Sequence, residues 1–142
     1  MDGKLVIPRI KYKAGYKYQL LRDYGIYTNI FPKEDIHSDF ISLYTDSLLL
    51  IRYSYAWDGP SGPTFDTGNF MRGSLVHDAL YQLMREGLLF IEAKKPTDLL
   101  LKRICQEDGM SKMRAWWVYN AVRKFANFAV KPEHTKPALW AP

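Results

Sequence analysis

Residues 70–89, FMRGSLVHDALYQLMREGLL, mark the point where strand-like alternation gives way to helical periodicity. Their apolar side chains recur at every third or fourth position, which predicts an amphipathic helix. We expect Ser74 to cap its N-terminus and Gly87 to end it. Because the strand-like segments come before this helix and the other helical segments come after it, the order of elements predicts an α+β fold.

The segments before the helix predict antiparallel strands and hairpins. Residues 16–30 are rich in Tyr, Ile and Thr and predict one or two strands, whereas the polar residues 31–39 predict a loop. Residues 40–57 predict a hairpin with its turn near residues 45–47, and the side chains of residues 48–55 alternate between two opposite faces, as in a strand.

The segments after residue 89 predict two further helices, about three in all. Pro96 and Thr97 open one that Gly109 ends, and Ser111 caps a longer one that runs to about residue 130. Five residues of the longer helix share a face at three- and four-residue spacing, and we expect that face to be a core stripe. They are Met113, Trp117, Ala121, Phe125 and Phe128.

The size of the chain favours one domain followed by an extended tail. The chain has 142 residues, of which 47% are hydrophobic, enough for a packed core. We expect a single α+β domain over residues 1–130 and a Pro-rich tail over residues 131–142. Trp140 is the predicted anchor that docks this tail, either on its own domain or on a neighbouring molecule.

Charge and cysteine content narrow the classes of function. The net charge is +5, but the basic residues are scattered, so we expect a solvated basic surface rather than a nucleic-acid site. The single cysteine, Cys105, excludes an intrachain disulfide and is predicted to be buried. Residues 1–13 contain no long apolar run, and we expect neither a signal peptide nor a membrane span.

Three polar residues on the first predicted helix form a candidate site. His77 and Tyr81 are four residues apart and project from one face, and Asp78 is rotated by about 100 degrees from His77, so that all three border one pocket. With Ser74 as N-cap, they lie in the first turns, where free N–H groups and the helix dipole favour the Asp78 carboxylate. His77 is the candidate general base.

The Gly- and Pro-rich loop at residues 58–69 leads directly into that helix and is longer than most connections. If it folds over the helix start, its oxygen atoms surround the candidate site and suit Ca²⁺ or Mg²⁺. The loop residues assigned to this role are Asp58, Gly59, Ser61 and Asp66.

A carboxylate is needed to orient the His77 ring, and the sequence offers Asp98 or Asp66. Asp98 opens the second predicted helix, and in a direct antiparallel pair of helices that end lies far from the start of the first helix. A structural interpretation stays open beside the catalytic one: Asp78 caps backbone N–H groups, His77 bonds to a loop carbonyl and Tyr81 packs in the core.

Several spaced motifs resemble the family known as domain of unknown function 1353. They are the loop Asp58-Gly59-x-Ser61-x-Pro63, the helix His77-Asp78-x-Leu80-Tyr81, Asp98 on the next helix, and Ala121-Val122-Arg123, over roughly residues 50–127. The resemblance implies a phage or prophage origin and no established activity. It favours a virion component of the tail, neck or baseplate, made in the host cytoplasm, whose partners are other phage structural proteins or copies of itself.

A looser similarity connects the same residues to secreted phospholipases, which place a calcium loop before a helix bearing His-Asp-x-x-Tyr. In that comparison Asp98 stands for their second-helix aspartate, while their disulfides are absent here. It implies the alternative function: a hydrolase of an ester, lipid or cell-wall bond, with His77 as base, Asp78 as metal ligand or electrostatic partner, and Tyr81 as positioning group.

Overall fold

The computed structural model describes residues 10–13, 18–57, 68–131 and 138–141. The chain divides into two compact units, one made of residues 1–58 with 136–142 and the other of residues 59–135. The first unit holds all the described strands and the second all the described helices, as expected for an α+β chain. The last residues group with the N-terminal unit, so this division cuts across the predicted layout of residues 1–130 and 131–142.

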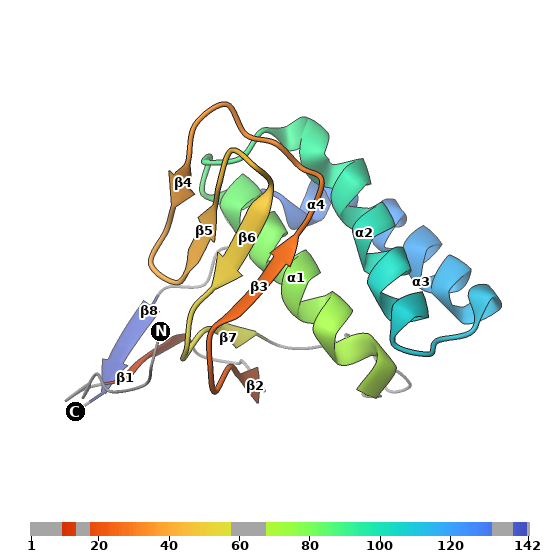
Figure 1. Cartoon of the computed structure of the whole chain (residues 1–142), viewed down its shortest axis with the longest axis horizontal. Coiled ribbons are helices and arrows are strands. Elements are labelled where there is room, and N and C mark those ends of the chain that lie inside the picture. The colour runs from red at the N-terminus through yellow and green to blue at the C-terminus, as the bar shows by residue number, and fades with distance from the viewer. Residues whose placement is uncertain (1–9, 14–17, 58–67, 132–137, 142) are drawn as a thin grey trace. The chain divides into compact units, whose positions relative to one another are not determined.

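The main sheet of the first unit has four antiparallel strands in the order β3-β6-β5-β4 (Figure 1). Their bounds are Tyr24–Tyr27 for β3, Ile36–His37 for β4, Ile41–Leu43 for β5 and Leu48–Ile51 for β6. The segment 31–39, predicted to be a loop, therefore contains a short strand, because residues 36–37 pair with β5.

The β5–β6 hairpin confirms the turn predicted near residues 45–47. Ser47 has φ 76° and donates its N–H to the Tyr44 carbonyl at 2.9 Å, which closes the turn. Along β6, Leu49 and Ile51 are fully buried whereas Leu48 and Leu50 are half-buried. This alternation follows from the two-residue period of a strand and fixes the register of the hairpin.

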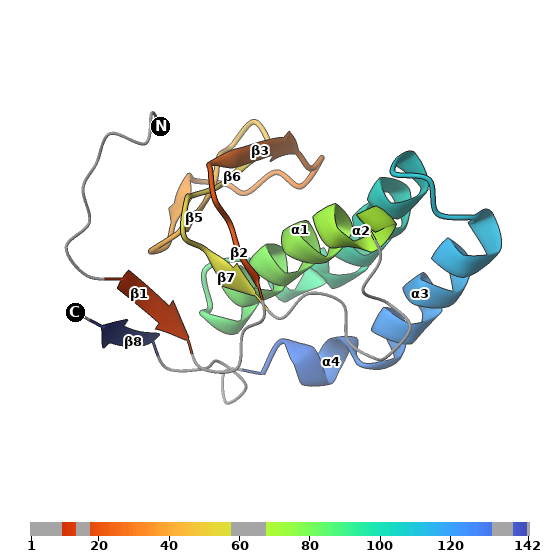
Figure 2. The same ribbon diagram turned by 90° about the horizontal axis from the view of Figure 1, so that it is seen from below.

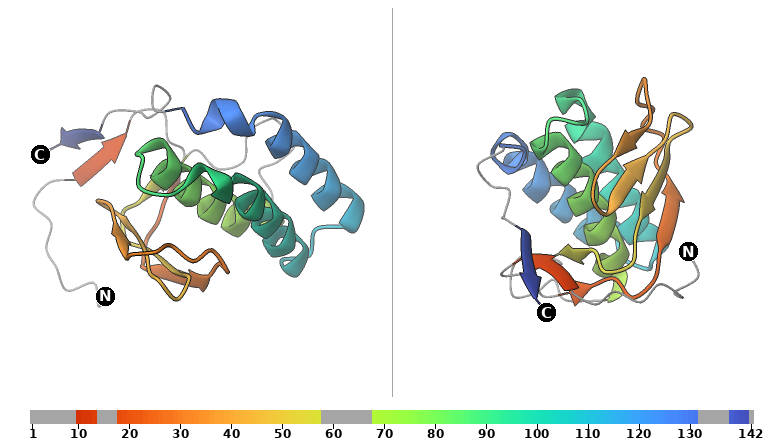
Figure 3. Two further views of the ribbon diagram at one scale, coloured as in Figure 1. Left: turned by 90° about the horizontal axis from the view of Figure 1, so that it is seen from above. Right: turned by 90° about the vertical axis from the view of Figure 1, so that its left-hand side faces the viewer.

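The other described strands of the first unit form two smaller antiparallel pairs. β2 (Tyr18–Gln19) pairs with β7 (Ala56–Trp57). β1 (Ile10–Lys13) pairs with β8 (Ala138–Ala141), so that the tail is a strand of its own chain where it is described (Figure 3). Trp140 lies in β8 opposite Lys11, and its role as an assembly anchor stays a prediction.

The described part of the second unit contains three longer helices and two short ones, and Figure 2 labels α1 to α4. Their bounds are Gly68–Arg85 for α1, Ile91–Ala93 for the 3₁₀ helix η1, Lys94–Glu107 for α2, Lys112–Lys124 for α3 and Ala126–Ala129 for α4. Gly87, with φ 75°, ends α1 as predicted: its N–H binds the Met84 carbonyl, and the Leu88 N–H binds the Leu83 carbonyl.

The predicted start of α1 at Ser74 is wrong, since the helix begins at Gly68. Ser74 lies inside the helix, where its hydroxyl donates to the Met71 carbonyl at 2.9 Å. A serine hydroxyl satisfies itself in this way within a helix as readily as at a cap, so the residue type alone was ambiguous. His77 and Asp78 therefore lie in about the third turn, away from the free N–H groups expected to favour a carboxylate there.

α1 and α2 run antiparallel and approach closely at Gly73. A methyl group on that residue would meet Leu101 Cδ1 at 2.8 Å and Cys105 Sγ at 3.0 Å. Immediately before Gly73, Arg72 donates from Nε and Nη2 to the two carboxylate oxygens of Asp108, both at 3.0 Å. The close approach at Gly73 fixes the register of the two helices, and the Arg72–Asp108 pair adds a partly exposed contact at the end of α2.

α3 packs against α2 through small residues rather than through the predicted aromatic stripe. Ser111 caps α3 as predicted, accepting a bond from the Arg114 N–H. The predicted long helix is interrupted at Phe125, which separates α3 from α4. The buried positions are Ala115, Val118 and Ala126.

The predicted core stripe is wrong for its large residues. Met113 is 82% exposed, and Trp117, Phe125 and Phe128 are each more than half exposed. Small side chains let α3 lie close to α2 and turn the neighbouring aromatic side chains away from that contact. Within the described residues, no helix is both long and apolar enough to cross a membrane.

Candidate functional site

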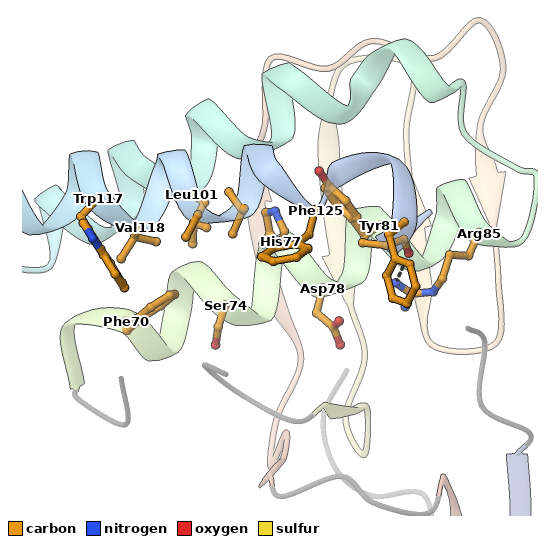
Figure 4. A pocket seen from close by; sticks show the side chains of 14 residues that line it. Phe70, Ser74, His77, Asp78, Tyr81, Arg85, Leu101, Trp117, Val118 and Phe125 are labelled. Atoms are coloured by element: carbon orange, nitrogen blue, oxygen red, sulfur yellow. Dashed lines mark hydrogen bonds between the residues drawn. The ribbon is translucent and has the colours of Figure 1, made fainter. Parts of the chain in front are cut away.

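A cavity of about 520 Å³ lies in the helical unit, where α1 and α3 both pack against α2 and leave a space between them (Figure 4). Most of its lining is aliphatic or aromatic. The described residues around it are Phe70, Ser74, His77, Asp78, Tyr81, Arg85, Leu101, Trp117, Val118, Ala121, Val122, Phe125, Phe128 and Ala129. Four of the five residues of the predicted core stripe are thus walls of this cavity: Trp117, Ala121, Phe125 and Phe128.

The α1 wall of the cavity is a continuous helical stripe. Phe70, Ser74, His77, Tyr81 and Arg85 follow one another at three- and four-residue spacing, and all of them line the cavity. At the rise of an α-helix this stripe spans about 22 Å. The cavity is therefore elongated along α1, with a phenylalanine at one end, an imidazole in the middle and a guanidinium at the other end.

Asp98 lies beside the middle of this stripe and is fully buried. Its Oδ1 lies 2.6 Å from His77 Nε2 and accepts a bond from the Tyr81 hydroxyl at 2.8 Å. Its Oδ2 accepts a bond from Arg123 Nη1 at 2.8 Å. One carboxylate on α2 thereby joins two side chains of α1 and one of α3, and we call these four residues the Asp98 network.

The Asp98 network sets the orientation and tautomer of His77. A carboxylate only accepts hydrogen bonds, so Nε2 carries the hydrogen and Nδ1 is left as the basic nitrogen. Within the described part of the chain, no hydrogen bond reaches Nδ1. The ring also stacks on Tyr81, with centroids 4.3 Å apart, and the side chain is 16% exposed.

Contact with Asp98 also favours the protonated forms of Tyr81 and Arg123. Burial, followed by the charge and hydrogen bond of Asp98, raises the pKa of the Tyr81 hydroxyl well above its ordinary value. The hydrogen bond from Arg123 to Asp98, reinforced by their charges, raises the pKa of the Arg123 guanidinium. Both side chains therefore stay protonated near neutral pH and continue to donate to Asp98.

The catalytic and structural interpretations of these residues overlap. A fully buried carboxylate is costly unless donors surround it, and three donors from two neighbouring helices meet that requirement. The network therefore locks α1, α2 and α3 together. It also leaves one face of His77 on a cavity, which stabilisation of the helices does not require.

The structure brings together three of the four predicted catalytic residues: His77, Tyr81 and Asp98. The expected distance problem for Asp98 is absent, because α1 begins at Gly68 and His77 therefore lies near the helix middle, opposite the second turn of α2. Asp78 lines the same cavity but is not among the three groups that bind Asp98.

The predicted loop residues Asp58, Gly59, Ser61 and Asp66 lie outside the described residues, so the expected covering of α1 by that loop is not described. Among the residues that are described, no group of three or more His, Cys, Asp or Glu side chains could hold a metal ion. Ca²⁺ or Mg²⁺ therefore stays a prediction that depends on the loop.

Sequence reasoning missed two functional side chains of this site. Arg123 was part of the Ala121-Val122-Arg123 motif but had no assigned role, and here it holds Asp98. Arg85 follows Tyr81 by four residues, and this spacing was the available signal. Burial raises the pKa of the Cys105 thiol to about 11, which suits a packed core residue rather than a nucleophile.

No family model, curated protein or solved structure matches this chain. Its function is therefore inferred from the geometry of the Asp98 network and the cavity beside it.

Proposed function

We propose that the chain is a hydrolase of carboxylic esters with an apolar acyl group, and that His77 is its general base. One observation carries the proposal: a fully buried Asp98 holds His77 Nε2 at 2.6 Å beside a largely apolar cavity of about 520 Å³. A base, an orienting carboxylate and a concave apolar site are the elements that such a reaction needs.

In the proposed reaction, His77 Nδ1 takes a proton from a water molecule in the cavity, and the resulting hydroxide attacks the ester carbonyl. Asp98 stabilises the imidazolium that forms, because its carboxylate already accepts the Nε2 hydrogen. When the tetrahedral intermediate collapses, the C–O bond to the alcohol breaks and the imidazolium returns the proton to the leaving oxygen. The products are one carboxylic acid and one alcohol.

Tyr81 and Arg123 are positioning residues in this mechanism. Both bind Asp98 rather than the cavity water, and Tyr81 also stacks on the imidazole. The cavity lining supports an apolar acyl group, since Phe70, Trp117 and Phe125 offer hydrophobic surface along its length. If residues 58–67 bring oxygen ligands to Asp78, a Ca²⁺ or Mg²⁺ ion held there would stabilise the developing oxyanion.

The test compares hydrolysis of p-nitrophenyl butyrate and laurate by the purified chain with that by His77→Asn. We expect wild-type turnover that favours the longer chain, and a loss of at least about 100-fold in the variant, the range of general-base catalysis. His37→Asn is the matched control, because His37 bonds to Ser42 in the sheet and lies outside the cavity. Melting temperatures are measured alongside.

Equal hydrolysis by wild type and His77→Asn, or no hydrolysis by a folded wild type, would overturn the proposal. A His77→Asn variant that loses activity while melting within a few degrees of wild type supports it. A large drop in melting temperature without any wild-type activity would assign the network a structural role only.

The assignment to a phage virion stays a proposal that rests on the family resemblance, and it is compatible with a hydrolase carried by a particle. Its partners would be phage structural proteins or copies of this chain, docked through the tail and Trp140. In the described residues, β8 pairs with β1 of the same chain. Deleting residues 131–142 is expected to weaken assembly while leaving a folded monomer, and unchanged particle reconstitution would refute this.

A further inference from the structure

Arg85 stands at one end of the cavity and lacks a counterion among the described residues. Its Nη1 donates to the Ala129 carbonyl at 3.1 Å, which fixes the guanidinium against α4. Its Nε is buried without a hydrogen-bond partner in the part of the chain that is described. Across the same residues no carboxylate forms an ion pair with Arg85, although the side chain lines the cavity.

Other arginines of the helical unit are arranged differently. Arg72 contacts the carboxylates of Glu107 and Asp108, and Arg123 contacts that of Asp98. A half-buried cation with an unpaired donor is unfavourable unless a partner neutralises it. Arg85 also has donors beyond the one that Ala129 uses, in the forked geometry that matches a carboxylate or phosphate.

We propose that the cavity binds a single-chain amphiphile whose oxyanion, a carboxylate or a phosphate, pairs with Arg85. The apolar chain lies along the α1 stripe past His77 towards Phe70 and Trp117. Two observations favour an anionic amphiphile. The mostly apolar walls of the cavity match a hydrocarbon chain, and the Arg85 guanidinium, which has no counterion among the described residues, matches an anion at one end.

The spacing along α1 gives this ligand a dimension. Arg85 follows His77 by eight positions, which corresponds to about 12 Å along the helix axis. This step rests on the proposed function: the preferred substrate is an ester whose alcohol portion bears an oxyanion at roughly this distance from the ester carbonyl. Binding of the amphiphile itself does not require His77 to act as a base, so the two proposals fail separately.

Binding is measured by the change in tryptophan fluorescence of the intact chain, because Trp117, one of its four tryptophans, is a wall of the cavity. The probes are dodecanoate, dodecyl phosphate and dodecanol, each below its micelle concentration or solubility limit, with acetate and inorganic phosphate as chainless anions. We expect both dodecyl anions to bind at least about tenfold more tightly than dodecanol, since a charge-assisted hydrogen bond contributes that much or more. The chainless anions should not compete at the same concentrations.

Four variants separate the contribution of Arg85 from those of an exposed arginine and of His77. Arg85→Gln should bind all three dodecyl probes with similar affinity, and Arg85→Lys should recover part of the preference. Arg103→Gln is the matched control, because Arg103 is exposed and pairs with Glu107 outside the cavity. His77→Asn should keep the preference even if it abolishes hydrolysis.

In the wild-type chain, the preference for the dodecyl anions over dodecanol should also weaken as ionic strength rises. This measurement does not depend on whether a variant folds. An Arg85→Gln variant that still prefers the dodecyl anions would overturn the proposal. So would a wild-type chain that binds none of the probes saturably, or one that binds dodecanol as tightly as dodecanoate.

Discussion

Replacing Asp98 by Asn tests the Asp98 network most directly. The change conserves the shape of the side chain but removes the charge from a fully buried position that receives bonds from His77, Tyr81 and Arg123. Breaking a buried ion pair by removing one partner typically costs about 3–5 kcal/mol. For a chain of this size, that loss corresponds to a fall in melting temperature of roughly 6–20 °C.

The same substitution alters the chemistry of His77. An amide side chain presents N–H as well as C=O, so it no longer requires the Nε2–H tautomer and cannot stabilise an imidazolium by charge. We expect ester hydrolysis to fall about 10²- to 10⁴-fold, a larger loss than the stability change explains when the assay is run well below the melting temperature.

The assay pairs urea denaturation with hydrolysis of p-nitrophenyl laurate. Asp108→Asn is the matched control, because Asp108 follows the same helix but is 25% exposed in its pair with Arg72. That change should cost less than about 1 kcal/mol and leave hydrolysis unaltered. If Asp98→Asn were as stable and as active as Asp108→Asn, the structural and catalytic roles assigned to the buried Asp98 carboxylate would be refuted.

Four further changes test other parts of the structure. Tyr81→Phe removes one donor to Asp98 but keeps the ring against His77, so stability should fall by about 1–3 kcal/mol in urea while hydrolysis falls less than tenfold; loss of all activity would contradict a positioning role. Gly73→Ala places a methyl group against Leu101 and Cys105 and should cost about 1–3 kcal/mol by thermal denaturation, and an unchanged melting temperature would show that α1 and α2 separate easily. Because burial raises the pKa of Cys105 to about 11 in the folded protein, the stability contributed by its protonated thiol is intact below pH 9 and is lost as pH rises towards 11, by up to about 1.4 kcal/mol per pH unit. Cys105→Ala should make the fall in unfolding free energy between pH 9 and pH 10 less steep, and a fall as steep as in wild type would contradict this assignment. Ser111→Ala should cost about 1 kcal/mol of stability through loss of the N-cap of α3, as measured by circular dichroism melting, and an unchanged melting temperature would contradict the capping role of Ser111.

The sequence alone determined the turns, helix ends and caps, which depend on residues a few positions apart along the chain. The β5–β6 hairpin was predictable because alternation and turn residues act within a few positions, and the same holds for Gly87 and for the Ser111 cap. The α+β order followed from the change of period near residue 70. The start of α1 was missed because Gly73 followed by Ser74 has the local pattern of a helix boundary, whereas in the structure Gly73 packs against α2 and Ser74 satisfies its hydroxyl inside the helix.

Only the tertiary structure decided what each helix face meets. Periodicity identified a face with Trp117, Phe125 and Phe128, but packing of small residues against α2 made that face a cavity wall instead of a core. The meeting of His77 with Asp98 likewise depends on the antiparallel register of α1 and α2, which is set by close contacts between residues distant in sequence. A one-dimensional pattern fixes the direction of a side chain relative to its own helix, whereas its partner is chosen by packing in three dimensions.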